Sequence, residues 1–274
     1  PLPPSSPRWR TDVGGDFLRA RCPKLLASDP FDEVVVVDDG STDGTSDSVS
    51  DQKYVRLEGE GVGAAIDAGH QKLLEILEDK FVSVVVAGDG QMDLSEMERL
   101  IEPIINGEAD YVKGERKDRA GKMPKLRRFG TFLLGLLTTL ACGQKISDPQ
   151  CGYTATSSKV LTDWEWNFSW KGYGYPNWWL MNLAAKGYRI KHVNVSAIYE
   201  GQKSGIKLVS FIPKVSLMLL LGLHLRILHN TVTRITIPLI VTWVTYYVAW
   251  TYNPLFFFAA HLSDRIHVRA ITGD

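Results

Sequence analysis

The stretch that decides the fold reads Val34-Val35-Val36-Val37-Asp38-Asp39-Gly40-Ser41-Thr42-Asp43-Gly44-Thr45. Four β-branched residues lead straight into two carboxylates and a turn of small residues. An uninterrupted apolar run of this kind is typical of a parallel strand that is buried on both faces. Ligands of open α/β sheets bind outside the carboxyl ends of such strands. We therefore expect a polar ligand at Asp38 and Asp39.

A second stretch repeats this arrangement at Phe81-Val82-Ser83-Val84-Val85-Val86-Ala87-Gly88-Asp89-Gly90-Gln91-Met92-Asp93. Two acidic strand ends with a glycine-rich helix start between them suggest one site for a sugar nucleotide and a divalent cation. The alternative is that each carboxylate only caps a helix or shapes a turn. That alternative stays open for Asp43 and Asp93 in particular.

Residues 31–113 alternate between strand and helix patterns, which predicts an α/β fold with a parallel sheet and right-handed crossovers. The expected strands are Val34–Val37, Tyr54–Leu57, Phe81–Ala87 and Ala109–Lys113. One helix is expected to begin at Gly61 and end near Glu78, and another to run from Leu94 to Asn106.

The glycines of the first helix, Gly61 and Gly63, have two explanations. They would let backbone approach a phosphate or ribose at a helix N-terminus, where amide groups favour anions. Close packing of the helix explains the same two glycines equally well.

The formal net charge is zero, but the charges are unevenly spread. Residues 31–60 carry nine acids against two bases, whereas residues 113–128 carry eight bases against two acids. An acidic pocket for a metal and a basic patch for phosphates would produce this division, although a solvated surface could produce either half alone. We expect no nucleic-acid partner.

The three cysteines, Cys22, Cys142 and Cys151, are too scattered for a disulfide framework or a cysteine-based zinc site, so a reducing compartment is expected. Residues 1–30 contain no signal-peptide pattern. They are expected to be an atypical or truncated N-terminal segment with a disordered Pro/Ser-rich start.

Beyond residue 124 the pattern becomes strongly apolar. Pro124 to Ala141 predicts a helix that belongs either to the core or to a lipid interface. Ile235 to Leu262 contains no Asp, Glu, Lys or Arg, and about twenty apolar residues suffice to cross a bilayer. A single membrane span kinked at Asn253-Pro254 is expected, with an in-plane or re-entrant helix as the alternative.

The segment Phe211 to His229 is apolar but carries charged and titratable side chains, which are costly at a bilayer centre. An interfacial amphipathic helix fits it better than a second span. Lys and Arg residues before the expected span outnumber those after it, which places the catalytic part in the cytosol. The expected divisions are a catalytic domain, an interfacial helix, a membrane segment and a tail, over residues 31–205, 206–232, 233–264 and 265–274.

These motifs resemble those of family-two glycosyltransferases of the GT-A fold, nearest the dolichol-phosphate mannose synthase and polyprenyl-phosphate hexosyltransferase branch. The similarity covers roughly residues 31–229. Besides the two strand ends, its carriers are Gly61-Val62-Gly63-Ala64-Ala65, Gly114-Glu115-Arg116 and Ser147-Asp148-Pro149-Gln150-Cys151-Gly152-Tyr153. The last motif and the membrane tail point to the lipid-phosphate branch.

The resemblance implies a GDP- or UDP-hexose donor and a polyprenyl or dolichyl phosphate acceptor. Asp38, Asp39, Gly61, Gly63 and Asp89 would contact the donor. Asp89, with Gln91 and Asp93, would bind Mg²⁺ or Mn²⁺, since hard cations choose oxygen ligands. Arg116, Arg127 and Arg128 would grip the acceptor phosphate with the guanidinium fork. The catalytic set would be Asp89, Gln91 and Arg116.

Two departures from the family pattern motivate alternatives. The usual Asp-x-Asp motif becomes Ala87-Gly88-Asp89, and residues 1–30 do not read as the family's first strand. One alternative is therefore a catalytically weak subunit that binds nucleotide sugar. Another is a membrane glycosyltransferase that acts on a hydroxyl, for which Asp148 is the candidate base.

Overall fold

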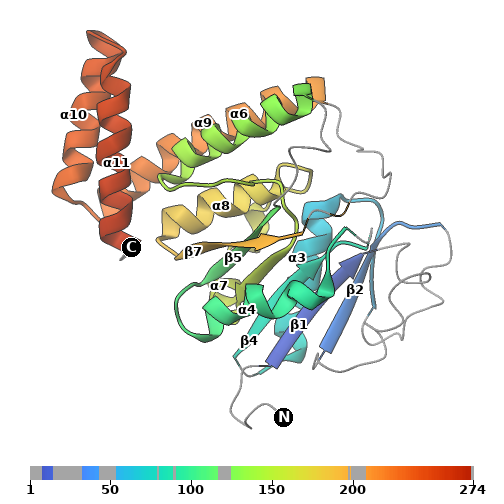
Figure 1. Cartoon of the computed structure of the whole chain (residues 1–274). Helices are drawn as coiled ribbons and strands as arrows, with labels where there is room; N and C mark the ends of the chain where they lie inside the picture. The colour runs from blue at the N-terminus through green and yellow to red at the C-terminus, as the bar shows by residue number, and fades with distance from the viewer. Residues whose placement is uncertain are drawn as a thin grey trace. The chain divides into compact units, whose positions relative to one another are not determined.

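The structure is a computed structural model that describes residues 8–14, 33–42, 54–78, 80–88, 91–116, 125–196, 198 and 208–272 (Figure 1). The chain divides into two compact units. The sheet unit comprises Pro1–Met123, Gln150–Pro176 and Ile190–Ile206. The helical unit comprises Pro124–Pro149, Asn177–Arg189 and Lys207–Asp274.

The described part of the sheet unit contains a seven-stranded sheet with the order β3-β2-β1-β4-β6-β5-β7. The strands are β1 Arg8–Gly14, β2 Glu33–Asp39, β3 Tyr54–Leu57, β4 Phe81–Val86, β5 Tyr111–Arg116, β6 Thr154–Ser157 and β7 Ile190–Val195. β6 runs antiparallel to β4 and β5, and the other neighbouring strands run parallel. The expected α/β fold with a mostly parallel sheet is confirmed.

Strand β1 lies near the middle of this sheet, between β2 and β4. Residues 1–30, which do not read as the family's first strand in the sequence, thus supply a strand of this sheet. The sequence of β1, Arg-Trp-Arg-Thr-Asp-Val-Gly, has no apolar run, and hydrophobic patterning misses it for that reason. Its place depends on backbone hydrogen bonds to both neighbours, which do not require particular side chains. The Pro/Ser-rich start, residues 1–7, and Cys22 lie outside the described residues.

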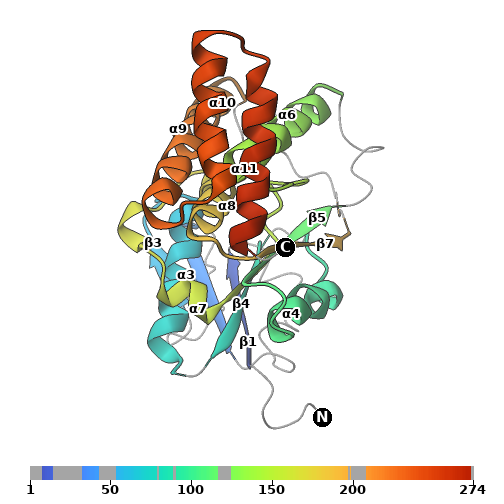
Figure 2. The same ribbon diagram turned by 90° about the vertical axis from the view of Figure 1, so that its left-hand side faces the viewer.

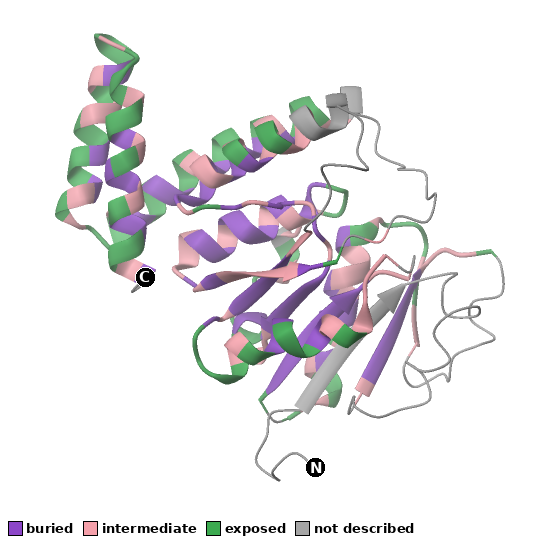
Figure 3. Cartoon of the chain, in the orientation of Figure 1, coloured by how far each residue is buried: buried purple, intermediate pink, exposed green. Residues whose placement is uncertain are grey.

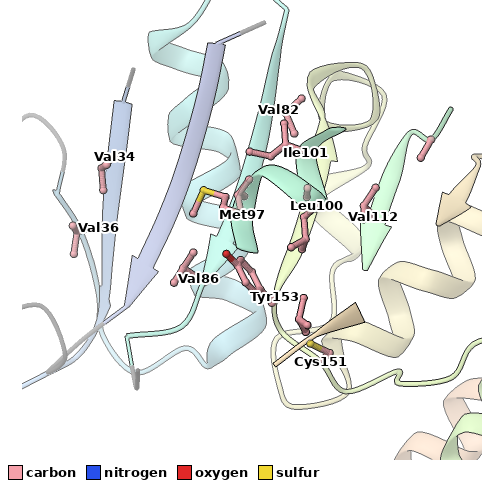
Figure 4. Packing of buried hydrophobic residues seen from close by; sticks show 14 residues of the cluster. Val34, Val36, Val82, Val86, Met97, Leu100, Ile101, Val112, Cys151 and Tyr153 are labelled. Atoms are coloured by element: carbon pink, nitrogen blue, oxygen red, sulfur yellow. The ribbon is translucent and has the colours of Figure 1, made fainter. Parts of the chain in front are cut away.

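The core of the sheet unit packs helix α4, Met97–Ile105, against the strands. Figure 4 shows Met97 and Leu100 of this helix near Val86 and Tyr153, and Ile101 beside Val82. A short helical turn, η3 Leu94–Glu96, leads into α4. Because apolar side chains of α4 recur at helical spacing, one face of the helix is buried while the other stays in water.

Helix α3, Val62–Ile76, packs against β1, β2, β3 and β4, and against the short helix α7, Ser158–Thr162. It buries His70 completely, with Nδ1 3.0 Å from the Ser83 hydroxyl oxygen. Burial disfavours the charged imidazolium and lowers the pKa of His70 to about 3. The folded protein therefore holds His70 neutral.

This histidine makes folding stability depend on pH. An unfolded chain protonates His70 near pH 6.5, whereas the folded chain does not, so its contribution to stability is lost as the pH falls from about 6.5 towards about 3. We expect a slope of at most about 1.4 kcal/mol per pH unit from this one group. Urea unfolding at pH 7.5 and 5 should give a smaller pH dependence for His70→Gln than for the wild type. The exposed His229 supplies a control, His229→Gln. An unchanged slope in His70→Gln would contradict this assignment.

The helical unit is built from α6 Lys125–Cys142, most of α8 Tyr175–Lys186, α9 Leu208–Thr233, α10 Ile237–Thr251 and α11 Phe256–Thr272. The helix expected from Pro124 to Ala141 is confirmed as α6. Among the described helices, one stretch is long and apolar enough to cross a membrane by length and composition alone, Phe211–Thr233 of α9.

The uncharged run Ile235–Leu262 does not form one kinked helix, so that expectation is wrong. α10 ends at Thr251, α11 begins at Phe256, and the two pack side by side as a hairpin (Figures 1 and 2). Pro254 lacks the N–H that a continuing helix needs, and the Asn253 side chain accepts a hydrogen bond from the Leu255 amide. The chain therefore turns at these residues instead of bending.

Arg226 of α9 is fully buried in the helical unit. Its Nη1 and Nη2 donate to the two carboxylate oxygens of Asp264 on α11, at 2.9 and 2.6 Å. Its Nε donates to the Ala141 carbonyl at 2.7 Å. From the sequence, Arg226 is a charge that would be costly in lipid. In the structure the Asp264 carboxylate pairs with it and neutralises it.

Candidate active site

Three strand ends of the sheet unit lie in one row. Val13 of β1 is paired with Val36 on one side and with Val86 on the other, so Asp38 is level with Gly88. Through β6, Val85 is level with Lys113, so Gly88 is also level with Arg116. All three positions are at the carboxyl edge of the parallel strands, where ligands of such sheets bind.

The row has an acidic end and a basic end. Asp38 and Gly88 are two strand spacings apart, and Gly88 and Arg116 are two further spacings apart. At about 4.8 Å per strand, Asp38 and Arg116 are separated by about 19 Å along the sheet edge. This separation suits an extended, charged ligand better than a single ion.

Asp38 has no exposed surface and is held by three residues. Its Oδ1 accepts a 2.8 Å hydrogen bond from the Ser41 amide, and its Oδ2 accepts from the Tyr54 hydroxyl and from Arg56 at 3.1 Å. Burial alone would raise the pKa of Asp38, but the hydrogen bonds from Ser41 and Tyr54 and the Arg56 charge outweigh it and lower that pKa. Asp38 is therefore a fixed carboxylate.

Asp39 organises the loop that precedes α3. Its Oδ1 accepts from the Glu60 amide and its Oδ2 accepts from the Gly61 amide, both at 2.7 Å. Unlike Asp38, it is partly exposed. The second carboxylate of the motif thus fixes the backbone immediately before the glycine pair.

The two glycines lie against the segment Trp170–Gly172. A Cβ on Gly61 would lie 2.6 Å from the Lys171 carbonyl oxygen, and a Cβ on Gly63 would lie 2.0 Å from the Trp170 carbonyl oxygen. The Gly63 amide donates to the Lys171 carbonyl at 2.8 Å, and the Lys171 side chain pairs with Glu60. These contacts explain both glycines by close packing, the alternative that the sequence left open.

The loop after β4 carries the expected metal ligands. Asp89 lies outside the described residues, as does Asp43, whereas Gln91 is described and partly exposed. Asp93 is the cap of η3, where its Oδ1 accepts from the amide and the hydroxyl of Ser95 at 2.9 and 2.7 Å. Among the described residues, no three His, Cys, Asp or Glu side chains group as a metal site.

The chemistry of Asp89 and Gln91 fits a hard cation, because both side chains offer oxygen. Two contacts hold the loop that carries these side chains. The Ala87 amide contacts the Met92 sulfur at 3.2 Å. Tyr153 donates its hydroxyl to the Asp93 carbonyl at 3.0 Å.

The basic residues divide between the two units. Arg116 ends β5 and is partly exposed, whereas Lys113 is fully buried and donates to the Cys151 carbonyl at 2.6 Å. Lys113 therefore does not belong to a solvent-facing basic patch. Arg127 and Arg128 are in the first turn of α6 in the helical unit, and their side chains lie outside the described residues.

The segment around Cys151 packs closely against β5. A Cβ on Gly114 would lie 3.0 Å from the Cys151 sulfur, and the Gly114 amide donates to the Tyr153 carbonyl at 2.8 Å. The glycine before Glu115 and Arg116 therefore allows close approach of this segment. Asp148, from the same motif, has no exposed surface.

Sequence reasoning missed Tyr54 and Arg56, the partners of Asp38, and the segment Trp170–Gly172. A signal for the first pair exists in the sequence, because residues two apart on a strand share a face. The parallel register sets Arg56 opposite Asp38. No local signal links residues 170–172 to the glycine pair, which is more than a hundred residues earlier in the chain.

Comparisons with known proteins agree with this architecture. The chain is 30% identical over 187 residues to an undecaprenyl-phosphate mannosyltransferase of Micrococcus luteus, covering 64% of this chain and 75% of that protein. It is 28% identical over 159 residues to the UDP-N-acetylglucosamine--dolichyl-phosphate N-acetylglucosaminyltransferase of Methanococcus voltae, covering 50% of this chain and 62% of that one.

A solved structure shares the fold. Glucosyl-3-phosphoglycerate synthase from Mycobacterium tuberculosis, in complex with Mn²⁺, uridine diphosphate and glucosyl-3-phosphoglycerate, superposes with a TM-score of 0.56 at 19% identity and 80% coverage of both chains. Residues 16–164 match the family model described as glycosyl transferase family 2. The chain belongs to this family and is a glycosyltransferase of the GT-A fold.

Proposed function

We propose that this glycosyltransferase moves a hexose from a nucleotide sugar to a polyprenyl or dolichyl phosphate, with a divalent metal and with inversion of the anomeric centre. The observation that carries the proposal is the row of strand ends, with Asp38 and Arg116 level on either side of the β4 end. The names of the two relatives, an undecaprenyl-phosphate and a dolichyl-phosphate enzyme, support the acceptor class.

The acidic end of the row is the proposed donor end. Asp39, which is partly exposed, would face the nucleobase and ribose of a GDP- or UDP-hexose, and the fully buried Asp38 would fix the strand end beside them. Tyr54 and Arg56 keep Asp38 ionised and fixed, and Asp39 fixes the backbone before Gly61. We assign Gly61 and Gly63 to the positioning of this loop rather than to direct ligand contact.

Asp89 and Gln91 would hold Mg²⁺ or Mn²⁺, which when bound would neutralise the diphosphate of the donor. We expect Asp89→Ala to lower transfer about a hundredfold or more, because several kcal/mol of transition-state stabilisation are lost. The measurement is initial transfer rate against Mn²⁺ concentration, with Glu75→Gln as the control, which removes an exposed carboxylate of α3 that pairs with Lys72. Near-normal turnover of Asp89→Ala in saturating Mn²⁺ would refute the assignment.

Arg116 is the proposed anchor for the acceptor phosphate, together with Arg127 and Arg128. We expect Arg116→Ala to lower kcat/KM for the lipid phosphate roughly ten- to a hundredfold, the value of one charge-assisted contact. Arg116→Lys should restore only part of this, because an ammonium lacks the fork geometry.

The control for Arg116 is Arg99→Ala, which removes an exposed arginine of α4 that pairs with Glu96. It should leave acceptor kinetics unchanged. If Arg116→Ala lost donor binding and acceptor use equally, Arg116 would be assigned to the donor diphosphate instead. An unchanged acceptor KM would reduce it to a solvated surface residue.

The acceptor needs little activation. A phosphate monoester has a second pKa near 6, so its oxygen is already anionic near neutral pH and can attack the anomeric carbon without a general base. The protein has to hold two anions together and stabilise the departing nucleoside diphosphate. In-line attack on an α-linked donor would give a β-linked hexosyl phosphate lipid.

The structure bears on both alternatives. A hydroxyl acceptor needs a carboxylate base, and Asp148, the candidate, is fully buried. A weak nucleotide-sugar-binding subunit was suggested partly by a missing first strand, yet β1 occupies the sheet. Neither alternative is favoured by a described residue.

We further propose that the chain is attached to a membrane with its catalytic part on the cytosolic side. The exposed leucines of α9, Leu217, Leu221, Leu225 and Leu228, follow one helical stripe, and the opposite stripe is buried within the helical unit. A helix packed on one face and apolar on the other suits the lipid interface. The basic residues before Ile235 favour the cytosolic side.

A further inference from the structure

The hairpin of α10 and α11 is exposed along much of both helices (Figure 3). Between Arg234 and Asp264 the exposed large side chains are aliphatic or aromatic, and the most exposed are Ile237, Tyr247, Trp250, Tyr252, Leu255, Phe258 and Leu262. No Asp, Glu, Lys or Arg occurs between Arg234 and Asp264. An apolar surface of this extent marks an interaction site, and the complete lack of charge selects lipid over a polar protein surface.

The charged residues gather at one end of the hairpin. The Thr236 hydroxyl is 2.8 Å from Nδ1 of His267, and the Ser263 hydroxyl donates to the Pro238 carbonyl at 2.6 Å. The beginning of α10 and the middle of α11 are therefore side by side. Asp264 of this end is paired with Arg226 of α9. The uncharged turn is at the opposite end.

The turn leaves no described backbone N–H without an acceptor. The amides of Tyr252 and Asn253 donate to the Val248 carbonyl, and the Leu255 amide donates to the Asn253 side chain. The amides of residues 256–258 donate to the carbonyls of residues 253–255, and Pro254 has no N–H. In hydrocarbon an unsatisfied N–H is costly, so these pairings are what a turn buried in lipid requires of its backbone donors.

The hairpin is too short to reach through a bilayer. α10 has 15 residues, which at about 1.5 Å per residue extend about 22 Å, against about 30 Å for the hydrocarbon core. We infer that α10 and α11 form a re-entrant hairpin, which enters the bilayer from one face, turns within the hydrocarbon at Tyr252–Leu255 and returns to the same face. This inference rests on the proposed membrane attachment but not on the proposed sugar transfer.

The depth of the turn can be measured with a nitroxide on Leu255→Cys, in the full chain reconstituted into sealed lipid vesicles. The background is Cys22→Ser, because Cys142 and Cys151 are buried. Spin relaxation should be enhanced by oxygen, which concentrates in lipid, and not by a water-soluble nickel chelate. Enhancement by nickel would place the turn in water or at the opposite headgroups, and enhancement by neither would mean that a second protein copy covers it. Either result overturns the inference.

The sidedness of the two ends is tested with single cysteines at exposed positions, Ile235→Cys before α10 and Ala270→Cys near the end of α11. A membrane-impermeant maleimide added to sealed vesicles of one orientation should label both ends at similar rates, and label Leu255→Cys at least about tenfold more slowly, since thiolates react from water. Labelling of the two ends from opposite sides would demonstrate a single span and overturn the inference. Donor binding checks the fold of each variant. Because no readout involves transfer, failure of the acceptor proposal would leave this result standing.

Discussion

Replacing Arg226 with Met should destabilise the helical unit by about 3–5 kcal/mol, because the Asp264 carboxylate then remains buried without its partner. The same change removes the Nε contact with the Ala141 carbonyl at the end of α6. Three helices, α6, α9 and α11, meet at this arginine. The measurement is denaturant unfolding in detergent, followed by circular dichroism.

A double-mutant cycle separates charge from packing. Arg226→Met combined with Asp264→Leu removes both charges, and an apolar pair of similar volume is often neutral or stabilising relative to a buried ion pair. We therefore expect the double variant to recover most of the loss. If Arg226→Met alone unfolds at the wild-type midpoint, the pair is not what joins these helices.

Gly63→Ala should have the second large effect. The new Cβ would lie 2.0 Å from the Trp170 carbonyl oxygen and 2.7 Å from the Tyr175 ring, and a backbone atom has little room to move away. We expect a loss of about 3 kcal/mol, at the upper end of the range for overpacking. The displaced loop is the one that Asp39 holds, so KM for the nucleotide sugar should also rise.

The matched control is Gly130→Ala in α6, where a Cβ would meet nothing within 4 Å. Because glycine is unfavourable inside a helix, this variant should be stabilised by about 0.5–1 kcal/mol. Both variants add one methyl group, so the difference between them isolates the contact with residues 170–172. Equal stability of the two would contradict close packing at Gly63.

The sequence predicts those parts of the sheet whose side chains carry the signal. The runs Val34–Val37 and Phe81–Val86 are buried on both faces, so hydrophobic patterning identifies them and the carboxylates that follow. Strand β1 has no such run, and its position depends on backbone pairing with two neighbours. Patterning carries no information about pairing of that kind.

Patterning also misses contacts at the candidate site and in the apolar C-terminal segment. Asp39 binds the Glu60 and Gly61 amides, and Trp170–Gly172 packs on the two glycines. Both contacts form only because the fold brings distant segments of the chain together. In the sequence, Arg226 is a lone charge within an apolar stretch. In the structure, the turn at Pro254 places Asp264 beside it. The uncharged run predicts contact with lipid, but its length alone does not distinguish one span from two shorter helices.

The central claim is most directly tested by identifying the lipid that the enzyme makes. The full chain in detergent is incubated with Mn²⁺, a panel of UDP- and GDP-hexoses, and either polyprenyl phosphate or the corresponding polyprenol, and the extracted lipids are analysed by mass spectrometry. We predict a hexosyl phosphate lipid, formed from the phosphate and not from the polyprenol, with release of one nucleoside diphosphate for each hexose transferred. Glycosylation of the polyprenol, or hydrolysis of the donor with no lipid product, would contradict the account.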